Sequence, residues 1–435
     1  MRNLITGLGI LALSLAVPAG AYAAEAPKPA AKTASVDWAK KSFDEIQQGA
    51  FKGDADAQYQ LGLSYMYESP IQDYFTALRW FQSAADQGHG LATYTAAIMY
   101  ALGQGTPVDF GRAMALYKLA AERGVVRAYS DIGIAYREGE AVTKDPVEAV
   151  KWFRKGADLK DPQSIMLLGR SYIDGIGVEK DIAKGLVLME AAATLGDIRA
   201  QQSLAAYYYF GNLGITDYTK AFQWAEKAAE NGSVWGHFYA GMMHELGRGT
   251  TIDYIAALQH YAIAVKQKHA QSLVRMAGMA CRGQGLKQDI PGCTKILSGL
   301  AGQGMPDAFF MMGELYETGG GLPKDLPRAY VWKHFGIILR DGKADEWPKE
   351  LNYLSDGFTL AERARLPGLR TEVAKAVGIR IEGAADGKVS WNEVRPSDFH
   401  FSNLRQPVAP LDASFSQPVI WKSENEPLHT PYQPG

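Results

Sequence analysis

Aspartate recurs at a constant interval of 36 residues along most of this chain, and no other feature constrains the fold as strongly. A fixed period of this length is typical of repeat proteins, in which each repeat buries its apolar face only by stacking on its neighbours. We therefore expect one stack of small repeats rather than the two or three compact domains that 435 residues alone would suggest. The aspartates of this period are Asp73, Asp109, Asp145, Asp181, Asp217, Asp253, Asp289 and Asp325.

Each repeat contains two stretches with helical spacing. A small residue lies four positions after each aspartate and a large residue three positions later, which is the spacing of one helix face. The other stretch begins with a small residue and carries, eight positions on, a tyrosine in most repeats, replaced by His244 and Ala280 in two of them. Each repeat is therefore predicted to be an antiparallel helix pair, and the fold class to be all-α. The first residues of the repeats are Ala57, Ala92, Ala128, Ser164, Ala200, Gly236, Ser272 and Ala308.

The glycines predict the corners of each repeat. They number 46, about 11% of the chain, against a usual share of about 7%. A G-x-G such as Gly103 and Gly105 follows the first helix, where the backbone needs conformations that other residues rarely adopt. The aspartate is then expected to cap the second helix by accepting backbone N–H groups. Glycines inside the first helix, such as Gly133, are expected to let a neighbouring helix approach closely.

The ends of the chain differ in character from the repeats. Residues 1–23 read as a signal peptide, with Arg2, an apolar run and the small-x-small site Ala21-Tyr22-Ala23, so we expect cleavage before Ala24 and a periplasmic or secreted protein of a bacterium. The apolar run is too short for a comfortable membrane span, and none is expected in the mature chain. Residues 24–35 read as a linker rich in proline and alanine.

The remaining boundaries follow from the repeat pattern. Residues 36–56 are predicted to be a capping half-repeat, 57–340 eight repeats, and 341–381 capping helices with a break at Pro367. Residues 382–435 are predicted to be an extended, proline-rich tail. The tail also carries aromatic residues, so both a free tail and one that packs on the repeats or binds a partner stay open.

The repeat resembles a known family. Its pattern, A-x-x-x-L-G-x-x-Y…G-x-G-x-x-x-D-x-x-x-A-x-x-W-[FY]-x-x-A-A-x-x-G, is similar to the Sel-like (Sel-one-like) repeat, a relative of the tetratricopeptide repeat, from Ala57 to about Arg340. The resemblance implies a right-handed superhelical α/α solenoid of helix-turn-helix repeats. It also implies a binding scaffold rather than an enzyme, and exported bacterial relatives imply a role in envelope signalling or polysaccharide export through bound proteins.

One stripe of the first helices is the candidate binding surface. By analogy with the tetratricopeptide superhelix, the positions two, six and nine residues after the start of each repeat line the concave face. We expect a protein or peptide partner to bind there, because aromatic residues, methionine and arginine are enriched at interfaces, although the aromatic residues equally fit an ordinary core. The predicted partner-binding residues are Tyr59, Leu63, Met66, Tyr94, Arg137, Arg170, Tyr209, Phe238, Glu245, Phe310 and Glu317.

Other chemistry receives little support from the sequence. A net charge of −2 gives no general attraction for nucleic acid, and no nucleophile motif such as G-x-S-x-G is present. His237, His244 and His260 are interpreted as substituted framework or surface positions, and no metal or cofactor is expected. We expect a monomer or weak oligomer. An envelope enzyme acting on glycan or peptide bonds stays open as the alternative function.

The chain has two cysteines, Cys281 and Cys293, twelve residues apart in one helix pair. An antiparallel pair could bring them within bridging range, and export would favour their oxidation. We predict a disulfide; two buried free thiols are the alternative.

Overall fold

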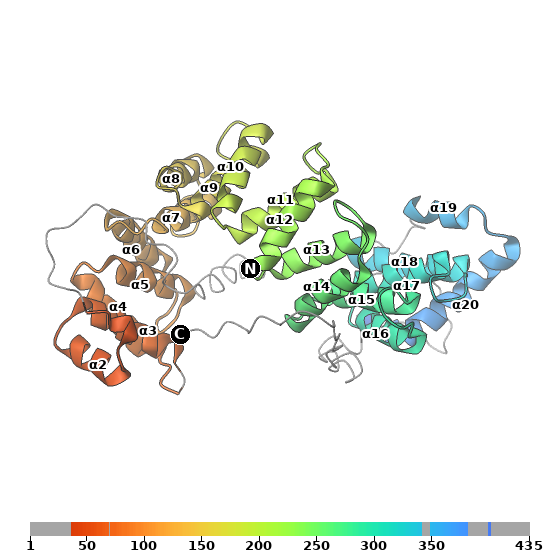
Figure 1. The fold of residues 1–435 in the computed structure, drawn as a ribbon, viewed down its shortest axis with the longest axis horizontal. Helices are drawn as coiled ribbons and strands as arrows, with labels where there is room; N and C mark the ends of the chain where they lie inside the picture. The colour runs from red at the N-terminus through yellow and green to blue at the C-terminus, as the bar shows by residue number, and fades with distance from the viewer. Residues whose placement is uncertain (1–35, 69, 342–348, 382–398, 402–435) are drawn as a thin grey trace, which may run out of the picture. The chain divides into compact units, whose positions relative to one another are not determined.

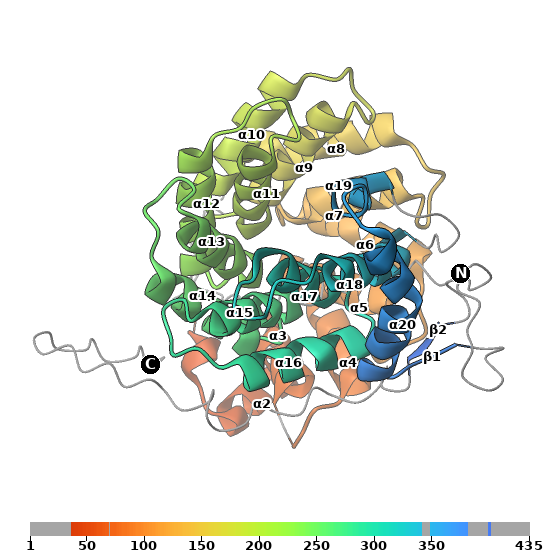
Figure 2. The same ribbon diagram turned by 90° about the vertical axis from the view of Figure 1, so that its right-hand side faces the viewer.

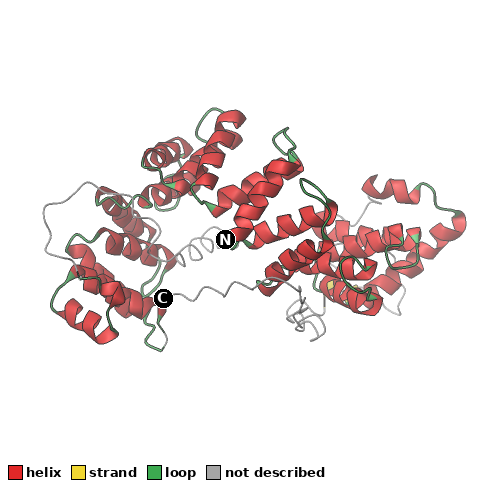
Figure 3. Cartoon of the chain, in the orientation of Figure 1, coloured by secondary structure: helices red, strands yellow, loops and turns green. Residues whose placement is uncertain are grey.

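The computed structural model describes residues 36–68, 70–341, 349–381 and 399–401, and this part of the chain is almost wholly helical (Figures 1 and 3). It divides into two compact units at the junction of Ser233 and Val234. The predicted signal peptide, the linker and most of the predicted tail lie outside the described residues. No helix within the described ranges combines the length and apolar character needed to cross a membrane.

Unit 1, which precedes the junction, contains a short cap and five helix pairs. Each helix from α2 to α12 packs on the next one along the chain. The elements are η2 (Trp38–Lys40), α2 (Phe43–Phe51), α3 (Ala55–Tyr67), α4 (Tyr74–Asp86), α5 (Gly90–Leu102), α6 (Phe110–Glu122), α7 (Ala128–Glu138), α8 (Pro146–Asp158), α9 (Pro162–Asp174), α10 (Ile182–Thr194), α11 (Ile198–Phe210) and α12 (Tyr218–Glu230).

Unit 2, which follows the junction, contains three helix pairs and a C-terminal extension. The elements are α13 (Val234–Leu246), α14 (Tyr254–Lys266), α15 (Ala270–Arg282), α16 (Ile290–Gly302), α17 (Pro306–Thr318), α18 (Leu326–Asp341), η3 (Lys349–Leu351), α19 (Asn352–Ser355), α20 (Leu360–Ala376), β1 (Ile379–Ile381) and β2 (Phe399–Phe401). The predicted solenoid of helix-turn-helix repeats is confirmed within each unit.

The C-terminal extension departs from the sequence prediction in two ways. The helix does not break at Pro367, because α20 continues through it. Proline inside a helix costs about 3 kcal/mol, which the burial of Leu366, Leu369 and Val373 offsets where α20 packs on α18. The second departure is a two-stranded antiparallel ribbon, in which Ile379 of β1 lies opposite Phe401 of β2, beside α20 (Figure 2).

The periodic aspartates begin the second helix of every pair, as predicted. In α8, Asp145 Oδ1 accepts a hydrogen bond from the backbone N–H of Glu148 at 3.0 Å. The backbone N–H of Asp145 also donates to the carbonyl of Tyr136 at 2.8 Å, which ties the end of the loop to the preceding helix. The same carboxylate cap is present at Asp73, Asp109, Asp181, Asp217, Asp253, Asp289 and Asp325.

Glycine allows close contacts within and between repeats. A Cβ on Gly133 would lie 2.3 Å from the ring of Phe153, so the fully buried Phe153 side chain occupies the space that any larger residue would need. Gly177, the second glycine of a G-x-G loop, has φ +73° and lies against the carbonyl of Pro146 in the preceding pair. The glycines predicted at corners and inside helices therefore fix the spacing of adjacent repeats.

Candidate protein-binding surface

The most prominent charged side chain on the first helices of unit 1 is Arg170. On α9, Gln163 to Gly169 and Ser171 to Ile173 are all buried by neighbouring helices. Arg170 lies between these two runs, yet its side chain is 61% exposed. Its Nε lies 3.4 Å from Asp174 Oδ2, and an exposed intrahelical ion pair of this kind contributes little to stability. The packing of α9 therefore does not require this arginine.

The first helices of the repeats before and after α9 also carry polar side chains. On α7, Arg137 Nε lies 2.7 Å from Glu138 Oε1, and its side chain is partly exposed. On α11, burial raises the pKa of the Tyr207 hydroxyl, and the charges of Arg170 and Asp174 act on it in opposite directions. We call Arg137, Glu138, Arg170, Asp174 and Tyr207 the arginine surface.

Other predicted partner-binding residues of unit 1 are used inside the solenoid. Met66, Tyr94 and Tyr209 are buried by the stacking of successive repeats. The Tyr209 ring packs on those of Phe210 and Tyr218. Such side chains stabilise the repeats and are not open to a partner in this structure.

Tyr59 and Leu63 are only half-buried. Tyr59 stacks on the His89 ring with centroids 4.7 Å apart. These two residues therefore keep part of their side chains accessible at the start of unit 1.

Tyr94 contacts a buried carboxyl that the sequence did not reveal. Its hydroxyl donates to Asp131 Oδ2 at 2.7 Å, joining α5 to α7 across a repeat boundary. Burial raises the pKa of Asp131 to about 6, and the Tyr94 hydrogen bond and Arg127 only partly counteract it. Asp131 is therefore a structural group whose charge is costly in the folded chain.

In unit 2 the first helices carry an ionic network centred on Glu245. Glu245 is buried on α13, and its Oε2 accepts a hydrogen bond from Tyr261 at 2.8 Å. Nη1 atoms of Arg275 and Arg282, both on α15, lie 3.7 and 3.9 Å from its Oε1. Arg282 also pairs with Glu314 of α17 at 2.5 Å. These contacts hold Glu245 inside unit 2 and join α13 to α14 and α15, so Glu245 is not open to a partner in this structure.

The three remaining predicted residues of unit 2 are partly buried. Phe238 packs on the rings of its neighbours Trp235 and His269. Phe310 lies 5.6 Å from the guanidinium of Arg340, and Glu317 pairs with Lys333 of α18. These contacts anchor all three residues within unit 2.

Sequence reasoning missed Tyr207, Asp131 and the Arg282 pair. Tyr207 directly precedes the framework tyrosine Tyr208. Its charged neighbours, Arg170 and Asp174, lie on α9, so no pattern within its own repeat identifies Tyr207 as a surface residue. Asp131 contacts Tyr94, which is 37 residues away in the sequence, and Arg282 contacts Glu314, which is 32 residues away. These residues come into contact only because the repeats stack.

The two cysteines meet as the spacing suggested. Cys281 at the end of α15 and Cys293 near the start of α16 are bonded, with Cα atoms 5.6 Å apart, and both are fully buried. The bridge closes the loop of the seventh pair.

In each helix pair a periodic aspartate caps the second helix, and glycines form the loop between the two helices. Stacked pairs of this kind define a class of α-solenoid repeat protein. The family model for the Sel1 repeat matches more than half of the chain, and the chain belongs to that family. Proteins with this repeat generally mediate protein–protein interactions, and the family typically acts as a scaffold. The matched residues are 55–89, 91–125, 126–161, 162–197, 198–233, 236–269 and 306–332.

Several solved structures are similar to the chain. One is c5321, a protective antigen of uropathogenic Escherichia coli with an SLR fold, at 21% identity over 78% of this chain and 95% of that one (TM-score 0.43). A Sel1 repeat protein from Oxalobacter formigenes is 27% identical over 57% of this chain and 94% of that one (TM-score 0.46). Immunity protein Pa5087 from Pseudomonas aeruginosa is 22% identical over 49% and 81% (TM-score 0.38). The comparison with curated proteins gives no match.

Proposed function

We propose that this protein is a non-enzymatic scaffold that holds a protein or peptide partner against the arginine surface of unit 1. The observation that carries the proposal is Arg170, a strongly exposed cation on a helix whose other central residues are covered. Packing of α9 against its neighbours requires apolar or small residues. An exposed guanidinium does not contribute to that packing, but it can bind a partner. Family membership supports the same class of function.

The surface chemistry indicates what the partner offers. Arginine binds a carboxylate through two parallel N–H···O bonds, and such pairs are stronger when a partner excludes water from them. Arg137 and Arg170 now contact Glu138 and Asp174, whose carboxylates are partly exposed and can yield to others. The proposed partner segment therefore carries carboxylates, with an apolar group beside Tyr207.

We further propose that the mature protein works outside the bacterial cytoplasm, in the periplasm or after secretion. The signal-like features of residues 1–23 support this location, and so does the Cys281–Cys293 bridge, because disulfides persist in oxidising compartments. A role in envelope signalling or polysaccharide export follows from the resemblance to exported relatives. Fractionation of the source cells and mass determination of the mature N-terminus test the location, and a cytoplasmic protein with an intact N-terminus would refute it.

The binding proposal is tested by crosslinking in periplasmic extract followed by mass spectrometry. Wild type is compared with Arg137→Glu/Arg170→Glu, and with Lys151→Glu as the control. Lys151 lies on α8, its side chain is 63% exposed, and it also pairs within its own helix. We expect the double variant to lose the crosslinked partner and the control to keep it. Equal recovery with all three proteins would refute the assignment of the surface.

A further inference from the structure

Three of the eight histidines of the chain lie in a single helix pair, α13 and α14. Two of them replace framework residues. His244 stands where six of the eight repeats have tyrosine, and His260 stands where the other seven have a large apolar residue. The corresponding large residues are Trp80, Leu116, Trp152, Leu188, Trp224, Ile296 and Trp332.

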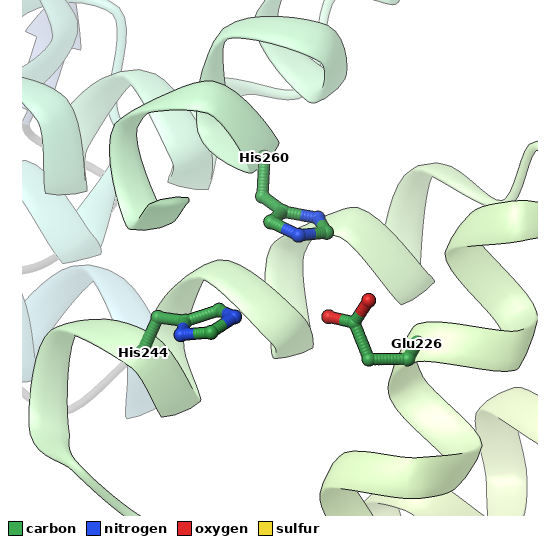
Figure 4. Close-up of side chains that lie close together, drawn as sticks. All are labelled: Glu226, His244 and His260. Carbon is green, nitrogen blue, oxygen red and sulfur yellow. The ribbon is translucent and has the colours of Figure 1, made fainter. Parts of the chain in front are cut away.

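The three imidazoles converge, with His260 in the middle. Nδ1 of His237 and Nδ1 of His260 are 3.1 Å apart. On the other side, the rings of His244 and His260 are nearly parallel, with centroids 5.8 Å apart, and face each other from α13 and α14 (Figure 4). A ring nitrogen of His244 lies within 4.8 Å of one of His260. His237 and His244 are seven residues apart, two helical turns, so both reach the same side of α13.

The separation of the two Nδ1 atoms fits a hydrogen bond between neutral imidazoles, and it also fits two ligands of one metal ion. Two nitrogens that bind one tetrahedral zinc ion at about 2.0–2.1 Å lie about 3.3 Å apart, close to the separation of the two Nδ1 atoms. An aromatic or aliphatic residue at position 260 would bury apolar surface without a desolvation cost, as it does in the other repeats.

We propose that His237, His244 and His260 bind a divalent transition-metal ion, with Zn²⁺ as the representative ion. Imidazole is a preferred ligand of zinc, copper and nickel, whereas calcium and magnesium prefer oxygen ligands. Three protein ligands leave a fourth position for water or for a donor group of a bound partner.

The chain itself supplies matched variants for the test. His260→Leu and His244→Tyr each restore the residue type that other repeats have in the same column, so both are compatible with the fold. His269→Asn is the control, because His269 belongs to the same unit but caps α15 through its Nδ1, and asparagine is also a good cap. Circular dichroism and the melting temperature without metal verify folding.

Zn²⁺ binding to the untagged mature protein is measured by isothermal titration calorimetry, and Co²⁺ absorption reports the ligand geometry. We expect one Zn²⁺ per chain, an affinity at least about tenfold weaker in His260→Leu and His244→Tyr, and no change in His269→Asn. Mg²⁺ should not compete. A wild type that binds no Zn²⁺, or binding that His260→Leu and His244→Tyr leave unchanged, would overturn the proposal.

Discussion

Replacing the buried Asp131 by asparagine should make the protein's stability less dependent on pH. The Asp131 carboxyl accepts a hydrogen bond from Tyr94 across the boundary between two repeats. Asparagine keeps an oxygen that can accept this bond and removes the buried charge. The variant therefore keeps the hydrogen bond that joins the two repeats and removes the charge that burial disfavours.

The expected magnitude follows from the two pKa values of the group. The carboxyl titrates near 3.8 when exposed and near 6 in the folded chain, a difference of about two pKa units. At 1.36 kcal/mol per unit, this corresponds to about 3 kcal/mol. The folded state holds the proton where the unfolded chain has released it, so the stabilisation is fully present below pH 4. It is lost as the pH rises through about 6.

Urea unfolding of wild type and Asp131→Asn at pH 4 and pH 8 measures this difference. The advantage of the variant should grow by about 2 to 3 kcal/mol from the lower to the higher pH. Asp86→Asn, at an exposed position at the end of α4, serves as the control and should show no such growth. A constant difference between wild type and Asp131→Asn across this range would show that burial does not dominate the ionisation of Asp131.

Two further predictions concern the framework. Gly133→Ala should lower the melting temperature, with a cost of about 1–3 kcal/mol, because its Cβ would meet the Phe153 ring. Gly299→Ala in α16, where a Cβ meets nothing within 4 Å, should instead stabilise by up to about 1 kcal/mol; destabilisation of both to the same extent would contradict the close-approach argument. Replacing Cys281 and Cys293 by alanine should cost about 3 kcal/mol in urea unfolding under oxidising conditions, and a reductant should remove the difference from wild type. Wild type insensitive to reductant would contradict the bridge.

The sequence predicted those parts of the fold that local chemistry determines. Asp217 caps α12 because a carboxylate satisfies free N–H groups wherever a helix begins, and this signal needs no knowledge of the neighbouring repeats. The glycine positions were equally informative because a missing Cβ has a local consequence at Gly133 and Gly177. The helix pairs of both units follow from these two signals and the helical spacing of small residues.

The binding surface could be predicted only in part, because exposure is a property of the stack. Tyr94 and Arg170 are both on the predicted stripe, yet one is buried and the other is 61% exposed. Asp131 of the next repeat accepts a hydrogen bond from Tyr94, so the burial of Tyr94 depends on a residue 37 positions away. The same holds for Pro367. The proline predicts a helix break, but α20 continues through it because α20 packs on α18.

The proposed role of Arg170 in holding a protein partner can be measured as the affinity of the purified partner for wild type, Arg170→Glu and Lys151→Glu, determined by calorimetry. The two positions have almost equally exposed side chains and each pairs within its own helix, so they differ chiefly in the surface that they occupy. We expect at least about tenfold weaker binding for Arg170→Glu, about 1.4 kcal/mol, and no change for Lys151→Glu. Equal affinity for all three proteins, or equal weakening by both substitutions, would contradict this role.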